Sequence, residues 1–189
     1  MLRYLSVGLL LLSSTAALAE GPSYSYIEGL YQEFDVDVGG GFDADGDGFT
    51  VAGSVAINDR WFVLVDYASA DFDAGFDFDR WSLGAGWRSA ISDRTDWYVT
   101  ASYVDAEISA GGFGSVSESG LGASIGIRSM LTPSLELAGA VRYSDPEEDT
   151  AIRGNLWYTV TGNLALGLAA DFGDDLSSYG VGFRLYFDK

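Results

Sequence analysis

Apolar residues alternate with small or polar residues along most of the chain. In "LALGLAADF" (164–172), three leucines, an alanine and a phenylalanine occupy every second position. The segments "YGVGFRLYF" (179–187), "LELAGAVRY" (135–143) and "FTVAGSVAI" (49–57) follow the same pattern. Successive side chains of a strand point to opposite faces, so a period of two predicts β-strands that each have one apolar face. No stretch after residue 20 keeps a helical period, and the fold class is therefore predicted to be all-β.

Turn-forming residues divide this pattern into ten expected strands. Short connections are expected at residues 58–60, 92–95, 132–134 and 161–163. Longer Asp- and Gly-rich loops are expected near residues 39–48, 72–79, 110–117, 145–149 and 173–177. Short turns at one end and longer loops at the other are typical of bacterial transmembrane β-barrels. The expected strands are 24–38, 49–57, 61–71, 80–91, 96–109, 118–131, 135–145, 150–160, 163–173 and 177–188.

The apolar face could point inward, as in a soluble lipocalin-like barrel, or outward toward lipid. The other face is mostly Gly, Ala, Ser and Arg, which suits a narrow interior better than a water-exposed surface. The apolar face is about nine residues long in each strand, enough to cross a bilayer when the strand is tilted. Aromatic residues also gather where that face ends, as at membrane interfaces. The predicted fold is a transmembrane antiparallel up-and-down β-barrel of ten strands, with eight as the alternative. The expected girdles are Trp61, Trp87, Trp97, Tyr158 and Phe187 at the turn end, and Phe49, Tyr67, Trp81, Tyr103, Tyr143, Phe172 and Tyr179 at the loop end.

The first residues read as a secretory signal peptide. Arg3 precedes an apolar run from Leu5 to Leu12, and Ala17-Leu18-Ala19 matches an A-x-A cleavage pattern. The run is too short to span a bilayer, which takes about 20 residues. We therefore expect residues 1–19 to be removed and residues 20–189 to form a barrel in the outer membrane of a Gram-negative cell, with its loops facing the exterior.

The charge balance is strongly acidic. Ten basic and 28 acidic residues give a net charge of −18, and most of the acids are expected at the loop end. Binding to nucleic acid needs a basic patch, so that class of partner is excluded. A one-signed surface attracts divalent cations. The expected partners are outer-membrane lipid and lipopolysaccharide, bridged by Ca²⁺ or Mg²⁺, and the barrel-insertion machinery; the protein is expected to be a monomer.

One stretch resembles the front half of a helix–loop–helix calcium site. Asp43, Asp45 and Asp47 alternate and Gly48 follows, but position 12 of such a loop is Ser54, inside an expected strand with no flanking helix. We therefore expect a flexible acidic hairpin loop with weak, shared Ca²⁺ or Mg²⁺ binding, and no cofactor.

An enzymatic role has little support. The chain has no histidine, the usual general base of small outer-membrane enzymes. The pairs Asp71–Asp73 and Asp77–Asp79 could serve as acid and base only in principle, and no nucleophile stands out beside them. We predict that the protein is not an enzyme.

Charged residues also occur on the face opposite the apolar one, and these would point into the lumen. An unpaired buried charge is costly, so opposite signs there should form hydrogen-bonded pairs. Such a network predicts a largely plugged lumen; the alternative is a narrow, cation-preferring channel. The predicted network is Glu28, Asp66, Arg88, Arg128, Glu136, Arg142, Arg153, Asp171 and Arg184.

Four stretches carry a resemblance to a known family. They are "SYSYIEGLYQEFDVD" (23–37), "DADGDGFTVAGSVAIND" (43–59), "DRWSLGAGWRSAISDRTDWYV" (79–99) and "ELAGAVRYSD" (136–145). The chain resembles small proteobacterial, xanthomonad-type outer-membrane β-barrel proteins once named for activation of plant immunity. The resemblance implies a single outer-membrane barrel, and the family's name implies an elicitor or signalling role.

Overall fold

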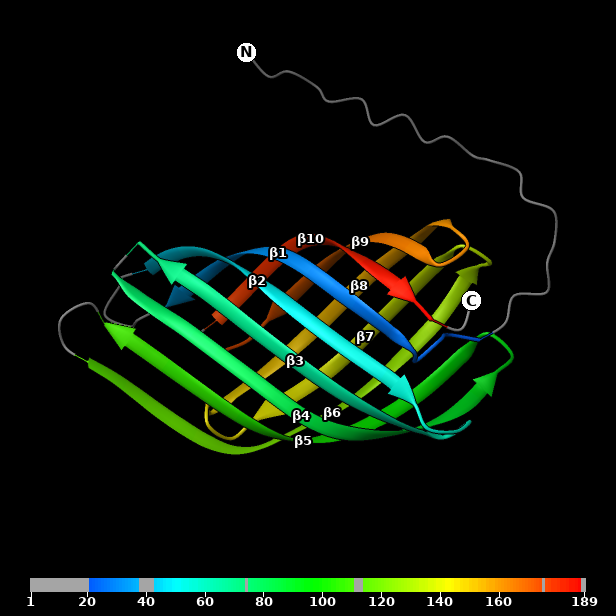
Figure 1. Cartoon of the computed structure of the whole chain (residues 1–189), viewed down its shortest axis with the longest axis horizontal. Helices are drawn as coiled ribbons and strands as arrows, with labels where there is room; N and C mark the ends of the chain where they lie inside the picture. Colours follow the sequence, from blue (N-terminus) through cyan, green and yellow to red (C-terminus); the bar gives the residue numbers. More distant parts are fainter. Residues whose placement is uncertain (1–20, 38–42, 74, 111–113, 175, 188–189) are drawn as a thin grey trace, which may run out of the picture.

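The protein is a closed barrel of ten antiparallel strands. The computed structural model describes residues 21–187 except 38–42, 74, 111–113 and 175. Each strand pairs with its neighbours in sequence, and β1 pairs with β10 to close the sheet (Figure 1). The strands are β1 (Tyr26–Asp37), β2 (Asp43–Ala56), β3 (Trp61–Phe72), β4 (Phe76–Ser92), β5 (Thr95–Ala110), β6 (Gly114–Thr132), β7 (Leu135–Ser144), β8 (Asp149–Thr161), β9 (Leu164–Phe172) and β10 (Leu176–Tyr186).

Closure leaves no free sheet edge. The seam between β1 and β10 is paired from Tyr26 opposite Tyr186 to Val36 opposite Leu176. Every backbone polar group in the wall can then bond to a neighbouring strand, which is the condition for spanning a bilayer with strands. The ten-strand prediction is confirmed, and the eight-strand alternative is wrong.

The two ends of the barrel are distinct, and we call them the turn end and the loop end. At the turn end the strands are joined at residues 57–60, 93–94, 133–134 and 162–163. The chain enters β1 and leaves β10 at this same end, at the right of Figure 1. The expected signal peptide, residues 1–19, lies outside the described residues. No helix in the described part of the chain is long and apolar enough to cross a membrane.

The apolar face points outward. Leu83, Leu121, Leu168 and Val181 each have more than half of their surface exposed. Soluble monomers rarely expose contiguous apolar patches beyond a few hundred Å², so a wall of such residues indicates contact with lipid. The lipocalin-like alternative is therefore wrong. Girdle residues exposed on the same face include Trp61, Tyr158 and Phe187 at the turn end and Tyr67, Tyr103, Tyr143, Phe172 and Tyr179 at the loop end.

The loop-end connections are shorter than the sequence suggested. β2 begins at Asp43 where residue 49 was expected, β4 at Phe76 where residue 80 was expected, and β6 at Gly114 where residue 118 was expected. β2 and β4 start early because Ala44, Phe72 and Phe76 pack together inside the barrel and hold this end of the sheet. Inward-facing residues of these strands are therefore buried even where Asp and Gly are frequent in the sequence.

Residues 43–48 are paired strand, so the prediction that they form a flexible acidic hairpin loop is wrong. Asp47 lies directly opposite Glu33 of β1 and Asp71 of β3. Asp45 and Asp47 share the outward face with Phe49 and are exposed. The remainder of that expected loop, residues 39–42, lies outside the described residues.

Candidate functional site: the barrel lumen

A buried carboxylate, Glu136 on β7, organises the turn-end half of the lumen. The residue is 1% exposed. Its Oε1 accepts hydrogen bonds from Arg128 Nε at 2.8 Å and from Arg184 Nη1 at 3.2 Å, and its Oε2 accepts one from the Tyr186 hydroxyl at 3.3 Å. Arg184 also donates from Nε to Glu28 Oε2 at 2.8 Å. These bonds connect β1, β6, β7 and β10, so the network reaches across the lumen.

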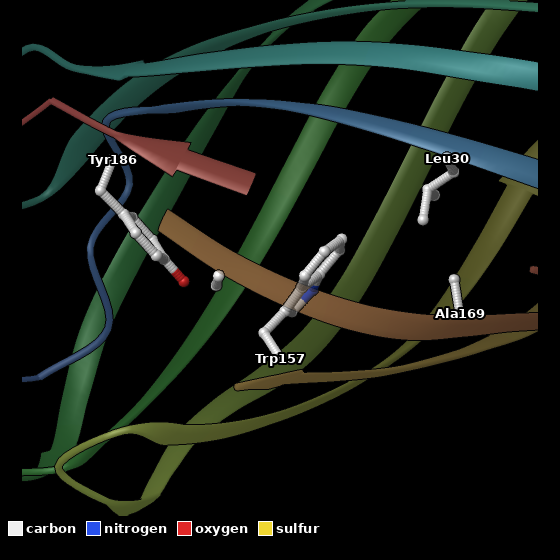
Figure 2. Close-up of a cluster of buried hydrophobic side chains, with 5 residues drawn as sticks. Leu30, Trp157, Ala169 and Tyr186 are labelled. Atoms are coloured by element: carbon white, nitrogen blue, oxygen red, sulfur yellow. The ribbon is translucent and has the colours of Figure 1, made fainter. Parts of the chain in front are cut away.

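Apolar and aromatic side chains pack beside this network. Trp157 and Tyr186 point into the barrel interior, and Leu30 and Ala169 lie on the loop side of them (Figure 2). Trp157 is 1% exposed and Ala165 is fully buried. The β8–β10 side of the lumen is therefore filled by side chains.

Arginines and aromatic rings also stack at this level. The Tyr26 ring centroid lies 4.1 Å from Arg184 Cζ and 5.4 Å from Arg128 Cζ. Arg184 Cζ lies 4.4 Å from the Trp157 ring. A guanidinium over an aromatic face is stabilised by the ring quadrupole, and more strongly when desolvated. The stacking fixes the arginines that the carboxylates neutralise.

A second turn-end group lies on the β3–β5 side. Arg88 pairs with Asp96 at 3.0 Å and donates to the Pro22 carbonyl at 3.3 Å. The Tyr24 ring lies 4.7 Å from the Phe62 ring. The residues before β1 therefore contribute to the filling of this half.

The middle and upper lumen holds further ion pairs. Arg80 Nη1 donates to Asp66 at 2.6 Å and its Nε lies 3.4 Å from Glu147. Arg142 Nη1 donates to Glu147 at 3.3 Å, and its Nη2 lies 3.9 Å from Asp149. Glu147 therefore links β4 and β7 from the connection between β7 and β8.

An apolar cluster lies inside the barrel at the loop end. Phe34, Ala44, Ala70 and Phe72 form a buried cluster, and the rings of Phe72 and Phe76 stack with centroids 4.4 Å apart. Val36, Phe78 and Leu176 pack against it. Sequence reasoning missed this cluster because the girdle argument assigned aromatic residues to the outer wall, whereas Phe34 and Phe72 occupy inward positions.

A cavity of about 190 Å³ lies in the lumen, between the turn-end side chains and the loop-end apolar cluster. Tyr26, Phe62 and Tyr98 line it toward the turn end, and Phe34 and Phe78 toward the loop end. Polar side chains on its walls bond to one another, including Gln32 to Ser178 at 2.9 Å and Thr50 to Gln32 at 2.6 Å. Within the described residues, Ser54 Oγ and Asp171 Oδ1 are buried there without a hydrogen-bond partner. A polar space of this size suits ordered water, which would satisfy such groups.

All nine residues expected in the lumen lie on its inner face and take part in ion pairs. The remaining pair of the set joins Arg153 Nε to Asp171 at 2.6 Å. Four other members, Arg80, Asp96, Glu147 and Asp149, were not in the predicted set. Arg80 could have been predicted from the sequence, since the alternation of its strand places it on the same inward face as Arg88. The nine residues are Glu28, Asp66, Arg88, Arg128, Glu136, Arg142, Arg153, Asp171 and Arg184.

Asp45 and Asp47 of the calcium-like stretch lie elsewhere, on the outer wall. Asp47 accepts a hydrogen bond from the Tyr31 hydroxyl at 3.0 Å, and Asp45 lies opposite Asp35. The side chain of Asp43 is not among those described. Among the side chains that are, no group of three or more His, Cys, Asp or Glu residues could hold a metal ion.

Closed antiparallel strands, a lipid-facing apolar wall and a lumen lined with ion pairs define an integral β-barrel membrane protein. The chain belongs to the outer membrane protein beta-barrel domain family, whose model matches residues 5–187. Its localisation is accordingly the outer membrane.

Solved structures share this fold at low sequence identity. An outer membrane channel from Pseudomonas putida F1 is 8% identical with a TM-score of 0.54, over 93% of this chain and 100% of that one. The KdgM porin in complex with disordered oligogalacturonate is 10% identical with a TM-score of 0.50, over 85% and 99%. The translocator domain of the autotransporter NalP from Neisseria meningitidis is 11% identical with a TM-score of 0.50, over 89% and 91%. No curated protein matches the chain significantly in sequence.

Proposed function

We propose that this barrel has a lumen closed by its own side chains and serves a structural or surface-interaction role as a monomer. The observation that carries the proposal is the Glu136 network, in which Arg184 bonds at once to Glu28 on β1 and to Glu136 on β7. Ions crossing the lumen would have to break buried charge-assisted bonds, and loss of one partner of such a bond is costly. The apolar cluster at the loop end adds a second barrier of different chemistry.

The interaction surface in this proposal is the acidic outer wall at the loop end, which would face the exterior. Glu33, Asp47, Asp71 and Asp77 lie directly opposite one another across β1 to β4. Like charges at opposed positions destabilise a sheet, and divalent counter-ions relieve that repulsion. Ca²⁺ or Mg²⁺ shared with the phosphates of lipopolysaccharide would tie the wall to the outer leaflet. The narrower resemblance to barrels named for plant immunity adds an elicitor or signalling role as a further prediction.

Single-channel recording in planar bilayers tests the closed lumen. The unmodified protein should be nearly silent, while Arg142→Ala and Arg184→Ala should raise conductance. Arg184 joins Glu28 on β1 to Glu136 on β7, and Arg142 holds Glu147, which also pairs with Arg80 on β4. Arg60→Ala is the matched control, since Arg60 is exposed in a turn and should leave the recording unchanged. Steady, large conductance of the unmodified protein, unaltered in both lumen variants, would contradict the proposal.

A narrow, cation-preferring channel is the second candidate. It is favoured by the 190 Å³ cavity with unpartnered polar atoms on its wall, which could be one stage of a path. In that case the unmodified protein should conduct, and its reversal potential under a salt gradient should show cation preference. Neither candidate uses catalysis, and we expect no hydrolase or acyltransferase activity from a chain without histidine.

A further inference from the structure

The five residues before β1, which we call the N-terminal strap (residues 21–25), are mostly buried although they are not part of a strand. Pro22, Ser23 and Tyr24 are all buried, and Tyr24 is only 2% exposed. Segments near a chain end are usually poorly ordered and solvated unless something holds them down. An aromatic residue buried in such a segment indicates a specific seat for it.

The seat of Tyr24 is built from four side chains of the barrel. Its ring centroid lies 4.4 Å from the guanidinium carbon of Arg88 and 4.4 Å from that of Arg128. It also lies 4.7 Å from the Phe62 ring and 6.4 Å from the Tyr98 ring. These residues come from β3, β4, β5 and β6, whereas the strap is continuous with β1. The ring therefore lies across the lumen from the strand to which it is attached.

The two ends of the strap show its course over the turn-end mouth. At one end, Ser25 accepts hydrogen bonds from Ala56 N at 3.3 Å through its hydroxyl and from Phe187 N at 3.0 Å through its carbonyl. At the other end, a Cβ placed on Gly21 would lie 3.5 Å from the carbonyl oxygen of Asp93, in the turn between β4 and β5. The strap thus runs from the β1, β2 and β10 side to the β4–β5 side.

The strap lies directly beneath the central cavity. Tyr26, Phe62, Tyr98 and Arg128 line that cavity, and three of these four side chains contact Tyr24 from the other side. The remaining half of the mouth is filled by the Glu136 network with Trp157 and Tyr186. Tyr24 and the Glu136 network therefore occupy complementary halves of the turn-end opening.

We propose that the N-terminal strap is a removable stopper that closes the β2–β5 half of the turn-end mouth and controls access to the central cavity. Ladder pairing of β1 begins at Tyr26, so residues 21–24 can leave without breaking a strand pair. The contacts that hold them include the Arg88 bond to the Pro22 carbonyl, the hydrogen bond that the Ser23 hydroxyl accepts from Ser25 N at 3.1 Å, and the ring contacts of Tyr24. This inference rests on the closed lumen proposed above.

Cysteine accessibility in the full-length chain provides the test. The protein has no cysteine, so Ser54→Cys, on the cavity wall and 4% exposed, introduces a single reactive group. A small cationic methanethiosulfonate should modify it slowly in the otherwise unmodified barrel. Adding Tyr24→Ala should raise the rate of this modification at least about tenfold. It should also raise bilayer conductance, because it opens the β2–β5 half of the turn-end mouth. Tyr24→Phe is the matched control: it keeps the ring between the two arginines and should leave both readings unchanged.

The outcomes separate the stopper from the closed lumen. Slow labelling and silence in both Tyr24→Ala and Tyr24→Phe would overturn the stopper and leave the closed lumen standing. Fast labelling and steady conductance without any change at Tyr24 would overturn the closed lumen and the stopper with it. Heat-shifted migration on gels reports whether each variant is folded. If Tyr24→Ala does not fold, replacing residues 21–24 by Gly-Gly-Gly-Ser keeps every strand pair and must open the mouth in the same way.

Discussion

Neutralising Glu136 should destabilise the barrel more than any other single loss of a carboxylate. The change is Glu136→Gln, which keeps the shape and one acceptor oxygen but removes the charge. In the described structure Arg128 has no other ion-pair partner, and Arg184 keeps only Glu28. Two buried guanidinium groups would then face one carboxylate.

The magnitude follows from burial. Removing one partner of a buried ion pair costs about 3–5 kcal/mol, because the partner left behind is an uncompensated charge. Glu136 is 1% exposed and Arg128 is 5% exposed, so solvent screening gives little relief. The retained amide oxygen can still accept from Arg128, which places the expected loss of unfolding free energy for Glu136→Gln near the lower limit, about 3 kcal/mol. Glu136→Ala, which also leaves a void, should lie toward about 5 kcal/mol.

Urea unfolding of the protein refolded in lipid vesicles measures this loss, followed by tryptophan fluorescence. Trp157 lies 4.4 Å from Arg184 and reports on the network itself. The matched control is Asp71→Asn, which removes one negative charge from an exposed position between Asp47 and Asp77 and should be neutral or slightly stabilising. An unfolding free energy of Glu136→Gln within about 0.5 kcal/mol of the unmodified protein, the range of ordinary surface changes, would refute the reasoning.

Three further results are expected. Gly167→Ala should lower stability by about 1–3 kcal/mol in urea unfolding, because the new Cβ would lie 2.3 Å from the Trp157 ring and 2.6 Å from the Leu156 carbonyl oxygen, whereas Gly154→Ala, with nothing within 4 Å, should not. Calorimetry at physiological salt should show millimolar-range or no Ca²⁺ binding, and a micromolar site that disappears in Asp45→Ala would prove this wrong. Intact mass should place the mature N-terminus at Glu20, and surface proteolysis of whole cells should cut at the loop end; cuts confined to the four turns would reverse the orientation.

Strand number, the closed topology and the direction of the two faces followed from period-two alternation. Alternation predicts these well because a one-residue shift would turn the whole apolar set of a strand to the wrong face. The nine lumen charges were found by the same parity. Arg142 and Arg184 lie among apolar residues in sequence, and only their parity marks them as inward.

The strand ends and the apolar cluster at the loop end were not predictable in this way. Asp and Gly favour turns locally, so residues 43–48 read as a loop. In the barrel, Ala44 packs against Phe34 and Phe72, and this long-range contact overrides the local preference. The N-terminal strap was not predictable for the same reason. In the sequence, Tyr24 continues the alternation of β1 and reads as part of that strand. Only its contacts with Phe62 and Arg88 show that it lies across the turn-end mouth.

The distribution of arginine links the inside of the barrel to its outside. Six of the ten basic residues, Arg80, Arg88, Arg128, Arg142, Arg153 and Arg184, make ion pairs in the lumen. Arg60 and Arg94 lie in turn-end connections, so the described outer wall carries no cation at the loop end to offset Glu33, Asp47, Asp71 and Asp77. Opposite charges are paired in the lumen, so its net charge is close to zero. The described outer wall at the loop end carries negative charges without basic residues to pair with them.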